Sequence, residues 1–206
     1  MSARQAVGKR PNELADTRAA ILDIAERLVQ RRGFNDFSYA DIASELGVTK
    51  AALHYHFPGK AELGEALLIR YTARFAQALY DIDASKDTAA SKLRSYAQLY
   101  LGVLRDERMC LCGMLAAEYR TLPPPMQSSL RQFFDDNHDW LERLLVEGRA
   151  DGSLAFPGSS RDAAQMILGS LEGAMLVART YGETSRFEMA ADQLLAEFAG
   201  KQTHLS

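Results

Sequence analysis

The chain has 206 residues, of which 47% are apolar and 25% are charged, and its formal net charge is −3. This composition supports a folded core and argues against global disorder, while no apolar run reaches the length of a membrane span. The first twenty residues lack a signal-peptide core, and two cysteines without a disulfide pattern fit a reducing compartment. We therefore expect a cytoplasmic protein without membrane contact. Strong alternation of apolar and polar residues is absent, which predicts an all-α fold.

The charge is divided unevenly along the chain. Residues 1–60 hold nine Lys or Arg and seven Asp or Glu, whereas residues 61–206 hold fifteen and twenty. A basic first part followed by an acidic remainder is expected of a DNA-binding domain joined to an effector domain. The basic excess is small, so the charge alone does not decide the function.

The first part of the chain predicts an arm and then a helix. Residues 1–12 are polar and predict a flexible arm, whose basic side chains either contact DNA or have no function. From Thr17 to Arg32 apolar residues recur at helical spacing, and Gly33 ends the pattern. This predicts an amphipathic helix that packs on the aromatic rings of the following loop.

The segment 38–60, SYADIASELGVTKAALHYHFPGK, predicts two short helices joined by a tight turn. Ser38 with Asp41 forms a capping-box pattern, and Gly47 allows a left-handed stop. Thr49 is a suitable N-cap for a second helix over 50–56, in which Leu53 is the one strongly apolar residue. A short helix with one buried residue and an otherwise exposed face is typical of a helix-turn-helix that enters the major groove of DNA.

This arrangement resembles the N-terminal domain of the tetracycline-repressor-like (TetR) family of bacterial transcriptional regulators. The resemblance covers about residues 15–65. The matching positions are Thr17-Arg18, Gly33-Phe34, Ser38, Asp41-Ile42-Ala43, Leu46-Gly47-Val48-Thr49-Lys50, Leu53, Tyr55-His56-Phe57-Pro58 and Lys60. Three positions depart from the family: Ala51 and Ala52, where the family often has Gly then Thr, and Gly59, where it often has Ser or Asn. The expected organisation is a helix-turn-helix domain over 13–59 and a helical-bundle effector and dimerisation domain over 60–206.

The resemblance also suggests how DNA is contacted. The residues that resemble the family's phosphate contacts, which fix the register on the duplex, are Thr49, Tyr55, His56 and Lys60. Ser38, at a helix N-terminus, can offer its hydroxyl and backbone N–H groups to a phosphate. The candidates for reading base edges or touching a thymine methyl group are Lys50, His54, Ala51 and Ala52. Tyr55 and Phe57 could instead be aromatic residues of the core.

The rest of the chain predicts further helices over 60–81, 87–106, 109–121, 124–149, 161–182 and 185–200, with a break at 81–83. The helix from Lys60 begins against the DNA-binding domain and is the expected transmission element. In the helix predicted over 161–182, small residues recur at three- and four-residue spacing, namely Gly169, Ser170, Gly173, Ala174 and Ala178. In the last helix Leu194, Leu195 and Phe198 supply the partner stripe. These residues predict either a dimer surface or packing within the chain against 124–149. The resemblance implies a homodimer through a four-helix bundle and an operator that is an inverted repeat.

The segment 109–119 holds both cysteines, a glycine and Glu118 among apolar residues. In a helix Cys110 and Cys112 would lie about 200° apart, which disfavours a shared metal ion or a disulfide. Each cysteine is either a small core residue or a thiolate sensor of oxidants or electrophiles, and Glu118 is either a paired structural carboxylate or a pocket wall. The residues expected to line a ligand pocket are Tyr96, Tyr100, Cys112, Glu118, Phe134, His138, Trp140, Met175 and Arg179.

These observations predict a ligand-responsive transcriptional regulator, a repressor that a small molecule releases from double-stranded DNA. The alternative trigger is modification of Cys110 or Cys112. No nucleophile–base set, phosphate loop or metal-ligand spacing appears, so no catalytic residue, cofactor or metal is predicted. A scaffolding protein that no longer binds DNA is a further alternative, motivated by Ala51-Ala52.

Overall fold

The computed structural model describes residues 11–200, with side chains from residue 14 onward, and it confirms the all-α fold. Within these residues the only β-structure is one isolated bridge between Leu154 and Ala199. The elements in order are α1 (Pro11–Arg32), α2 (Tyr39–Leu46), α3 (Lys50–His56), α4 (Lys60–Ala84), α5 (Ala89–Arg105), α6 (Leu111–Ala117), the 3-10 turn η1 (Tyr119–Thr121), α7 (Pro124–Ala150), α8 (Ser160–Tyr181) and α9 (Thr184–Ala196). None of these helices is both long and apolar enough to cross a bilayer.

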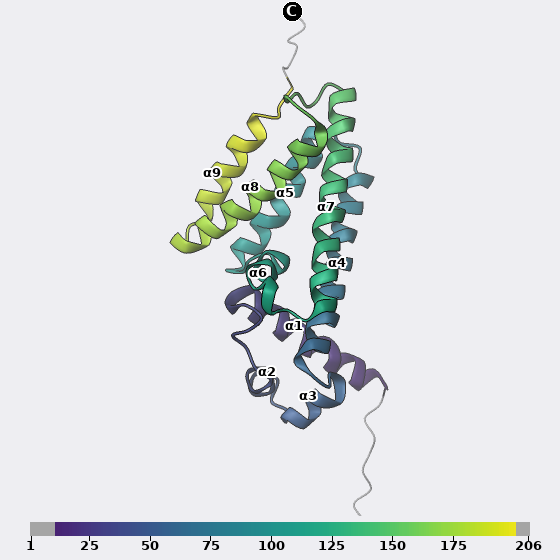
Figure 1. The fold of residues 1–206 in the computed structure, drawn as a ribbon, viewed down its shortest axis with the longest axis vertical. Coiled ribbons are helices and arrows are strands. Elements are labelled where there is room, and N and C mark those ends of the chain that lie inside the picture. Colours follow the sequence, from purple (N-terminus) through teal and green to yellow (C-terminus); the bar gives the residue numbers. More distant parts are fainter. Residues whose placement is uncertain (1–10, 201–206) are drawn as a thin grey trace, which may run out of the picture.

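The first three helices form a small domain at one end of the molecule (Figure 1). Each contributes fully buried aliphatic side chains: Ile21 and Val29 from α1, Ile42 from α2 and Leu53 from α3. The loop after α1 adds two buried phenylalanine rings that meet edge to face, as the sequence predicts. Helix α1 begins at Pro11, six residues before the predicted start, because proline is well tolerated in the first turn of a helix. The last two residues of the predicted arm are thus helical, and residues 1–10 lie outside the described part.

Helix α4 connects the two parts of the molecule (Figure 1). It leaves α3 through the Phe57-Pro58-Gly59 turn and continues along α7. The predicted break at 81–83 is wrong, because α4 extends to Ala84. This segment contains no glycine or proline, and Asp83 accepts a hydrogen bond of 3.0 Å from Trp140 Nε1, which ties the last turn to α7.

The larger part is a bundle in which α7 and α8 pack against each other and α9 packs on α8 and α5. Helix α9 was predicted to reach residue 200 but ends at Ala196. The chain forms a turn after Ala196, and Phe198 O then accepts a hydrogen bond from Ala155 N at 2.9 Å while Gly200 N donates to Ser153 O at 3.1 Å. These bonds connect the end of the described chain to the α7–α8 loop.

The predicted helix 109–121 is divided in the structure. Helix α6 covers only Leu111–Ala117, and η1 follows as a separate turn. Met109 is held outside the helix because its backbone pairs with Gln30 of α1, with N–H donating to Gln30 O at 3.2 Å and its carbonyl accepting from Gln30 Nε2 at 2.9 Å. The pairing fixes the start of α6 against the DNA-binding domain.

Candidate DNA-binding surface and effector cavity

The turn between α2 and α3 is built by the local signals that the sequence contains. The Asp41 carboxylate accepts from Ser38 N–H at 2.7 Å and is hydrogen-bonded to Ser38 Oγ at 2.6 Å. These bonds from Ser38, the hydroxyl first, lower the pKa of Asp41. Gly47 ends α2 with φ of +69°, and Thr49 Oγ1 accepts from Ala52 N–H at 3.3 Å. The predicted caps are confirmed.

The outer face of α3 has the polar character that the sequence predicts. Lys50, Ala51, His54 and Tyr55 are exposed, and Ala52 and His56 are half-buried. Tyr55 is 73% exposed, so the core does not use its ring. Phe57 is buried beneath the Arg18 guanidinium, 4.9 Å from its ring centroid, and is therefore a core aromatic residue. Tyr55 remains available for a partner, whereas Phe57 does not.

Like Ser38 and Thr49, the predicted DNA contacts His54 and Lys60 already have intramolecular partners. His54 Nδ1 lies 3.0 Å from Pro58 O, and its ring lies 4.8 Å from that of Tyr39. The Lys60 ammonium donates to Phe37 O and lies 4.2 Å from the centroid of the Phe37 ring. Partial burial lowers the pKa of Lys60. Both side chains hold the loops around α3 in place.

Tyr39 was missed by the sequence analysis. Its hydroxyl lies 2.6 Å from Gly59 O and 3.0 Å from Phe57 O, which fixes the turn between α3 and α4. Burial, with a smaller contribution from Glu62, raises the pKa of Tyr39 to about 12. Its position next to Ser38 carries no sequence signal for this role, because its partners lie about twenty residues downstream.

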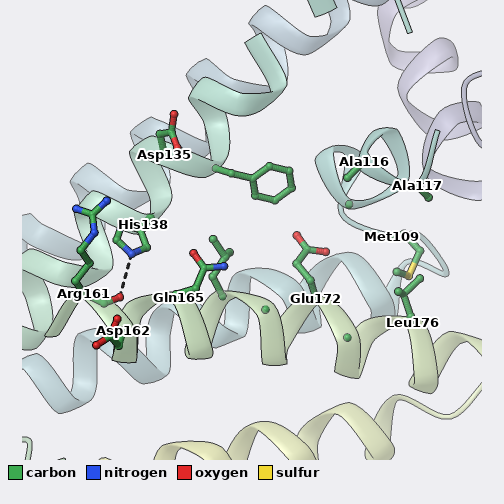
Figure 2. Close-up of a pocket in the computed structure, with 15 residues that line it drawn as sticks. Met109, Ala116, Ala117, Asp135, His138, Arg161, Asp162, Gln165, Glu172 and Leu176 are labelled. Carbon is green, nitrogen blue, oxygen red and sulfur yellow. Dashed lines mark hydrogen bonds between the residues drawn. The ribbon is translucent and has the colours of Figure 1, made fainter. Parts of the chain in front are cut away.

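A cavity of about 670 Å³ lies between α6, α7 and α8 (Figure 2). Phe134 and His138 of α7 line one wall, and Gln165 and Glu172 of α8 point into it from the opposite side. Small residues of α6 close one end. The volume lies within the range of pockets that hold small organic molecules.

Of the nine predicted pocket residues, only Phe134 and His138 line this cavity. Five others are buried in the core, namely Tyr96, Tyr100, Cys112, Trp140 and Met175. The hydroxyls of Tyr96 and Tyr100 are 2.8 Å apart, and Tyr96 is also hydrogen-bonded to Asn137 at 3.2 Å. Their polar atoms therefore find partners inside the bundle. Tyr100 does line a second, smaller cavity of about 180 Å³ beside α4.

Glu118 and Arg179 lie outside the cavity and connect the bundle to the DNA-binding domain. The Glu118 carboxylate accepts hydrogen bonds from the backbone N–H groups of Phe34 and Asn35, the latter at 3.2 Å. Arg179 donates to Arg31 O at the end of α1. Of the two predicted roles of Glu118, the structure shows the paired carboxylate, and its partners are backbone amides.

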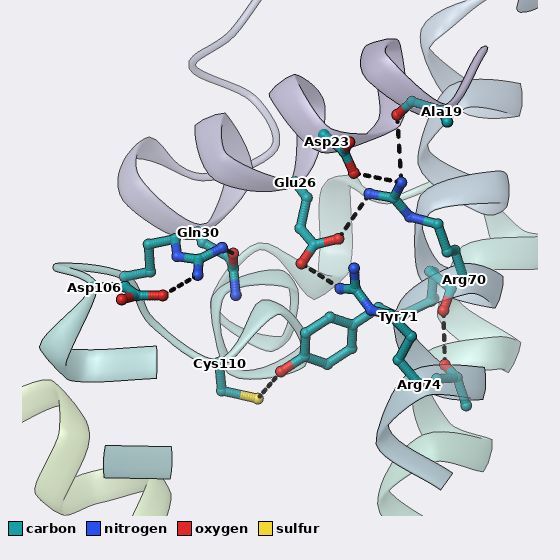
Figure 3. A network of polar contacts seen from close by, with 12 residues as sticks. Ala19, Asp23, Glu26, Gln30, Arg70, Tyr71, Arg74, Asp106 and Cys110 are labelled. Carbon is teal, nitrogen blue, oxygen red and sulfur yellow. Dashed lines mark hydrogen bonds and ion pairs between the residues drawn. The ribbon is translucent and has the colours of Figure 1, made fainter. Parts of the chain in front are cut away.

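A second set of contacts ties α1 to α4 (Figure 3). Arg70 lies 2.7 Å from Asp23 Oδ1 and 2.9 Å from Glu26 Oε2, and Arg74 pairs with the other oxygen of Glu26. The Glu26 side chain is almost completely buried by these partners. The predicted transmission helix α4 thus holds α1 directly, and α6 holds the opposite end of the same helix.

Glu172 was not among the predicted pocket residues. Its Oε1 is shielded from solvent and has no hydrogen-bond partner within residues 11–200. Burial, followed by the neighbouring Cys110, raises the pKa of Glu172 well above its usual range. Its carboxylate lies over Gly113, where a Cβ atom would come within 2.4 Å of Oε2. The glycine inside α6 is therefore explained by the close approach of this carboxylate.

The two cysteines are buried and free, and they are closer than the sequence predicts. Cys110 is the N-cap of α6 and is not helical, so the expected separation on opposite faces does not apply. A hydrogen bond from the Cys112 thiol lowers the pKa of Cys110 to about 6 against the opposing effect of burial. Burial raises the pKa of Cys112. The Tyr71 hydroxyl donates to Cys110 Sγ at 3.7 Å.

One group of potential metal ligands occurs in the described part of the chain. Ligand atoms of His138, Asp139 and Glu142 lie within 4.8 Å of one another. The His138 ring is already engaged, since its Nε2 lies 3.0 Å from Arg161 O, and Glu142 faces the Arg161 guanidinium at 3.7 Å. We assign no metal to this group.

Helix α8 has one face in the core and one outside. Ile167, Leu171 and Met175 are fully buried. Met166, Leu176 and Val177 are more than half exposed, and a Cβ atom on Gly169 or Gly173 would meet nothing within 4 Å. The two glycines are therefore not used for packing against α7, and they lie among exposed apolar side chains. Ala178, by contrast, faces the core.

Comparisons with known proteins agree with this architecture. A family model described as "Bacterial regulatory proteins, tetR family" matches residues 21–67, and one described as "Tetracyclin repressor-like, C-terminal domain" matches residues 89–194. The chain belongs to the TetR family. It is therefore a transcriptional regulator and not an enzyme. Members of this family bind DNA and small-molecule ligands and typically act as dimers.

Several TetR-family members are similar over most of their length. The transcriptional repressor BepR of Brucella suis is 29% identical over 168 residues, which cover 78% of this chain and 79% of BepR. A TetR-family regulator from Agrobacterium tumefaciens is 30% identical, with a TM-score of 0.87 over 91% of this chain and 100% of that structure. The reduced form of Escherichia coli NemR is 26% identical, with a TM-score of 0.78 over 91% and 100% of the two chains. The two-part helical architecture is thus shared along the whole described chain.

Proposed function

We propose that this protein is a homodimeric repressor that a small molecule releases from an inverted-repeat operator. The observation that supports this most directly is the position of α6. Gly113, Ala116 and Ala117 line the cavity, and Glu118, the next residue, holds the backbone of the DNA-binding domain. A ligand that favours one position of α6 would therefore shift the DNA-binding domain with it.

We assign the DNA contacts to the exposed face of α3 and the residues around it, with the domain boundary at 59–60. Lys50 and His54 would read base edges, and Ala51 and Ala52 would touch thymine methyl groups. Phosphates would be bound by Ser38, Thr49, Tyr55, His56 and Lys60. In a symmetric dimer the two α3 helices would enter successive major grooves about 34 Å apart, so a small tilt of α1 and α4 would misplace one of them.

We assign the dimer contact to α8 and α9. The exposed apolar side chains that support it are Met166, Val177 and Tyr181 on α8 and Met189 on α9. Gly169 and Gly173 lie in the same region and would let a helix of the second subunit approach closely. Leu195 of α9 and Phe198, which follows α9, are buried in the chain's own core, so they are not available to a partner.

Sedimentation and gel-shift measurements with two matched variants test the dimer and its operator. Val177 on α8 and Val146 on α7 are exposed to a similar extent, 53% and 55%. Val177→Asp should produce monomers and lose operator binding, whereas Val146→Asp should stay dimeric. Sequence-specific binding should weaken steeply with salt, since phosphate contacts release counterions. A monomeric wild-type protein, or one that binds no genomic fragment, would refute the proposal.

An alternative trigger is the modification of Cys110. Cys110 lines the smaller cavity beside α4, through which an electrophile could approach it, and the neighbouring thiol favours its thiolate form. Iodoacetamide provides the test, because the thiolate displaces iodide and forms a C–S bond. Alkylation should release DNA from the wild-type protein and from Cys112→Ser but not from Cys110→Ser. The alkylation rate should rise through about pH 6 and then level off. Equal release from Cys110→Ser would exclude this trigger.

A further inference from the structure

The effector cavity is lined by Glu172, whose carboxylate oxygen Oε1 has no hydrogen-bond partner in the described part of the chain. We infer that the effector of this protein is an organic cation, an ammonium or a related ion, bound by the carboxylate of Glu172. This inference rests on the proposed function in one respect, that the cavity between α6, α7 and α8 is the effector site.

The first argument is the state of the Glu172 carboxylate. Its Oε1 is shielded from solvent and lacks a hydrogen-bond donor anywhere in residues 14–200, the part for which side chains are described. A buried carboxylate without a partner is unfavourable, because it loses hydration and gains no compensating interaction. Figure 2 shows Glu172 pointing from α8 into the cavity, so the missing donor can come from a ligand there.

The second argument is the absence of a side chain at Gly113, which leaves room for this carboxylate. A Cβ atom at position 113 would come within 2.4 Å of Glu172 Oε2, so only glycine permits this close approach to α6. The other carboxylate oxygen, Oε1, has no hydrogen-bond partner among the described residues. The side chain is therefore held in place at the cavity wall.

The third argument is the charge and shape of the remaining wall. Asp135 and Asp162 also line the cavity, and the one guanidinium that does so, Arg161, lies 3.7 Å from a carboxylate oxygen of Glu142. An anionic ligand would therefore meet three carboxylates and a cation that already has a partner. A cation would meet Glu172 and the ring of Phe134, which also lines the cavity and whose face can attract positive charge.

The size of the cavity suggests what the rest of the ligand resembles. About 670 Å³ is far more than one ammonium group needs. Apolar side chains of Met109, Leu168 and Leu176 line the space around the acidic groups. We therefore expect a hydrophobic cation, in which hydrocarbon fills the cavity and the charged nitrogen contacts Glu172.

Calorimetric titration of the full-length protein tests this inference. The probes are arylalkyl ammonium ions from about nine to about twenty non-hydrogen atoms, so that the upper members can fill the cavity. The smallest is 2-phenylethylammonium, and 2-phenylethanol and 3-phenylpropionate are its neutral and anionic counterparts. The ammonium ions should bind about tenfold or more tightly than their alcohols, since a charge-assisted hydrogen bond replaces a neutral one.

Two variants distinguish Glu172 from the other carboxylates. Glu172→Gln preserves the shape and should remove the preference for the cation, whereas Asp135→Asn, at an exposed carboxylate, should change it by less than about fivefold. Gly113→Ala should also weaken cation binding, because the added methyl group displaces the carboxylate. Circular dichroism and thermal midpoints of the variants establish that they are folded.

Three results would overturn the inference: no ammonium ion binds, the alcohol or the carboxylate binds as well, or Glu172→Gln keeps the preference. A separate gel-shift arm tests the proposed function. Cations that bind through Glu172 without releasing operator DNA would leave the ligand class standing and refute the proposed switch. A neutral compound that binds in the cavity and releases DNA would support the proposed switch and refute the ligand class.

Discussion

The DNA-binding surface and the effector cavity are built on opposite principles. On α3 the candidate functional side chains are exposed, and the buried Leu53 only holds the helix in place. In the cavity the candidate functional group, Glu172, is half-buried, and its carboxylate oxygen Oε1 is shielded from solvent. At the first site the exposed side chains of Lys50, Ala51 and Tyr55 can be changed with little effect on the fold, whereas a change of Glu172 also changes packing.

The largest effect is expected from a change to Leu53, the buried residue that holds α3 in place, and not from a change on the exposed face of α3. Leu53→Ala should destabilise the DNA-binding domain by about 2–5 kcal/mol, because it removes a fully buried side chain and leaves a cavity. Operator binding should be lost while ligand binding to the bundle persists. Thermal unfolding and gel shifts measure both, with Tyr55→Ala as the exposed control. Normal stability of Leu53→Ala would show that α3 is not held by this residue.

The next effect concerns the contact between the two regions. Glu118→Ala removes the acceptor for the backbone N–H groups of Phe34 and Asn35, at a cost of about 1.5–3 kcal/mol in the interaction of α6 with the DNA-binding domain. The variant should bind operator and ligand separately but need more ligand for release. Titrating ligand into the protein–DNA complex measures this coupling. Glu107→Ala, at an exposed residue 3.9 Å from Arg31, is the control. If Glu118→Ala needs no more ligand than the wild-type protein to release DNA, the contact made by Glu118 does not link ligand binding to DNA release.

A smaller effect tests which exposed side chain reads sequence. Lys50→Ala should lose about 1–3 kcal/mol of binding and relax the base preference at one operator position if Lys50 contacts a base edge. Lys60→Ala should weaken binding without changing the base preference. In the wild-type protein the Lys60 ammonium donates to Phe37 O, so the substitution loosens the fold around α3. Selection of bound DNA from a random pool distinguishes the two variants. An unchanged consensus with Lys50→Ala would reject the base contact.

The smallest effect is expected from the phenol group on the same surface. Tyr55→Phe removes a single hydroxyl from a residue that is 73% exposed, so stability should not change. Binding should weaken by about 0.5–1.5 kcal/mol on every operator sequence alike, as expected for a phosphate contact. Gel shifts on two unrelated operators provide the comparison. Equal binding by Tyr55→Phe and the wild-type protein would mean that the hydroxyl does not contact DNA.

The DNA-binding half was predictable from the sequence because its signals are local. The cap at Ser38, the left-handed Gly47 and the cap at Thr49 each depend on residues within a few positions of one another. Helical spacing likewise identified the helices, since periodicity follows from the helix itself. Where no glycine or proline was present, as at 81–83, the end of a helix was misplaced.

The residues that form the effector site could not be predicted from the sequence, because contacts between distant segments bring them together. Glu172 and Gly113 are 59 positions apart, and Glu118 reaches residues more than eighty positions upstream. Cys110 left the expected helix because Gln30 paired with its neighbour Met109. The sequence by itself determined the helices, their caps and the exposed face of α3, because local hydrogen bonds and periodicity specify these. Only the tertiary structure decided which polar side chain was left without a partner, because that depends on what every other helix brings to it.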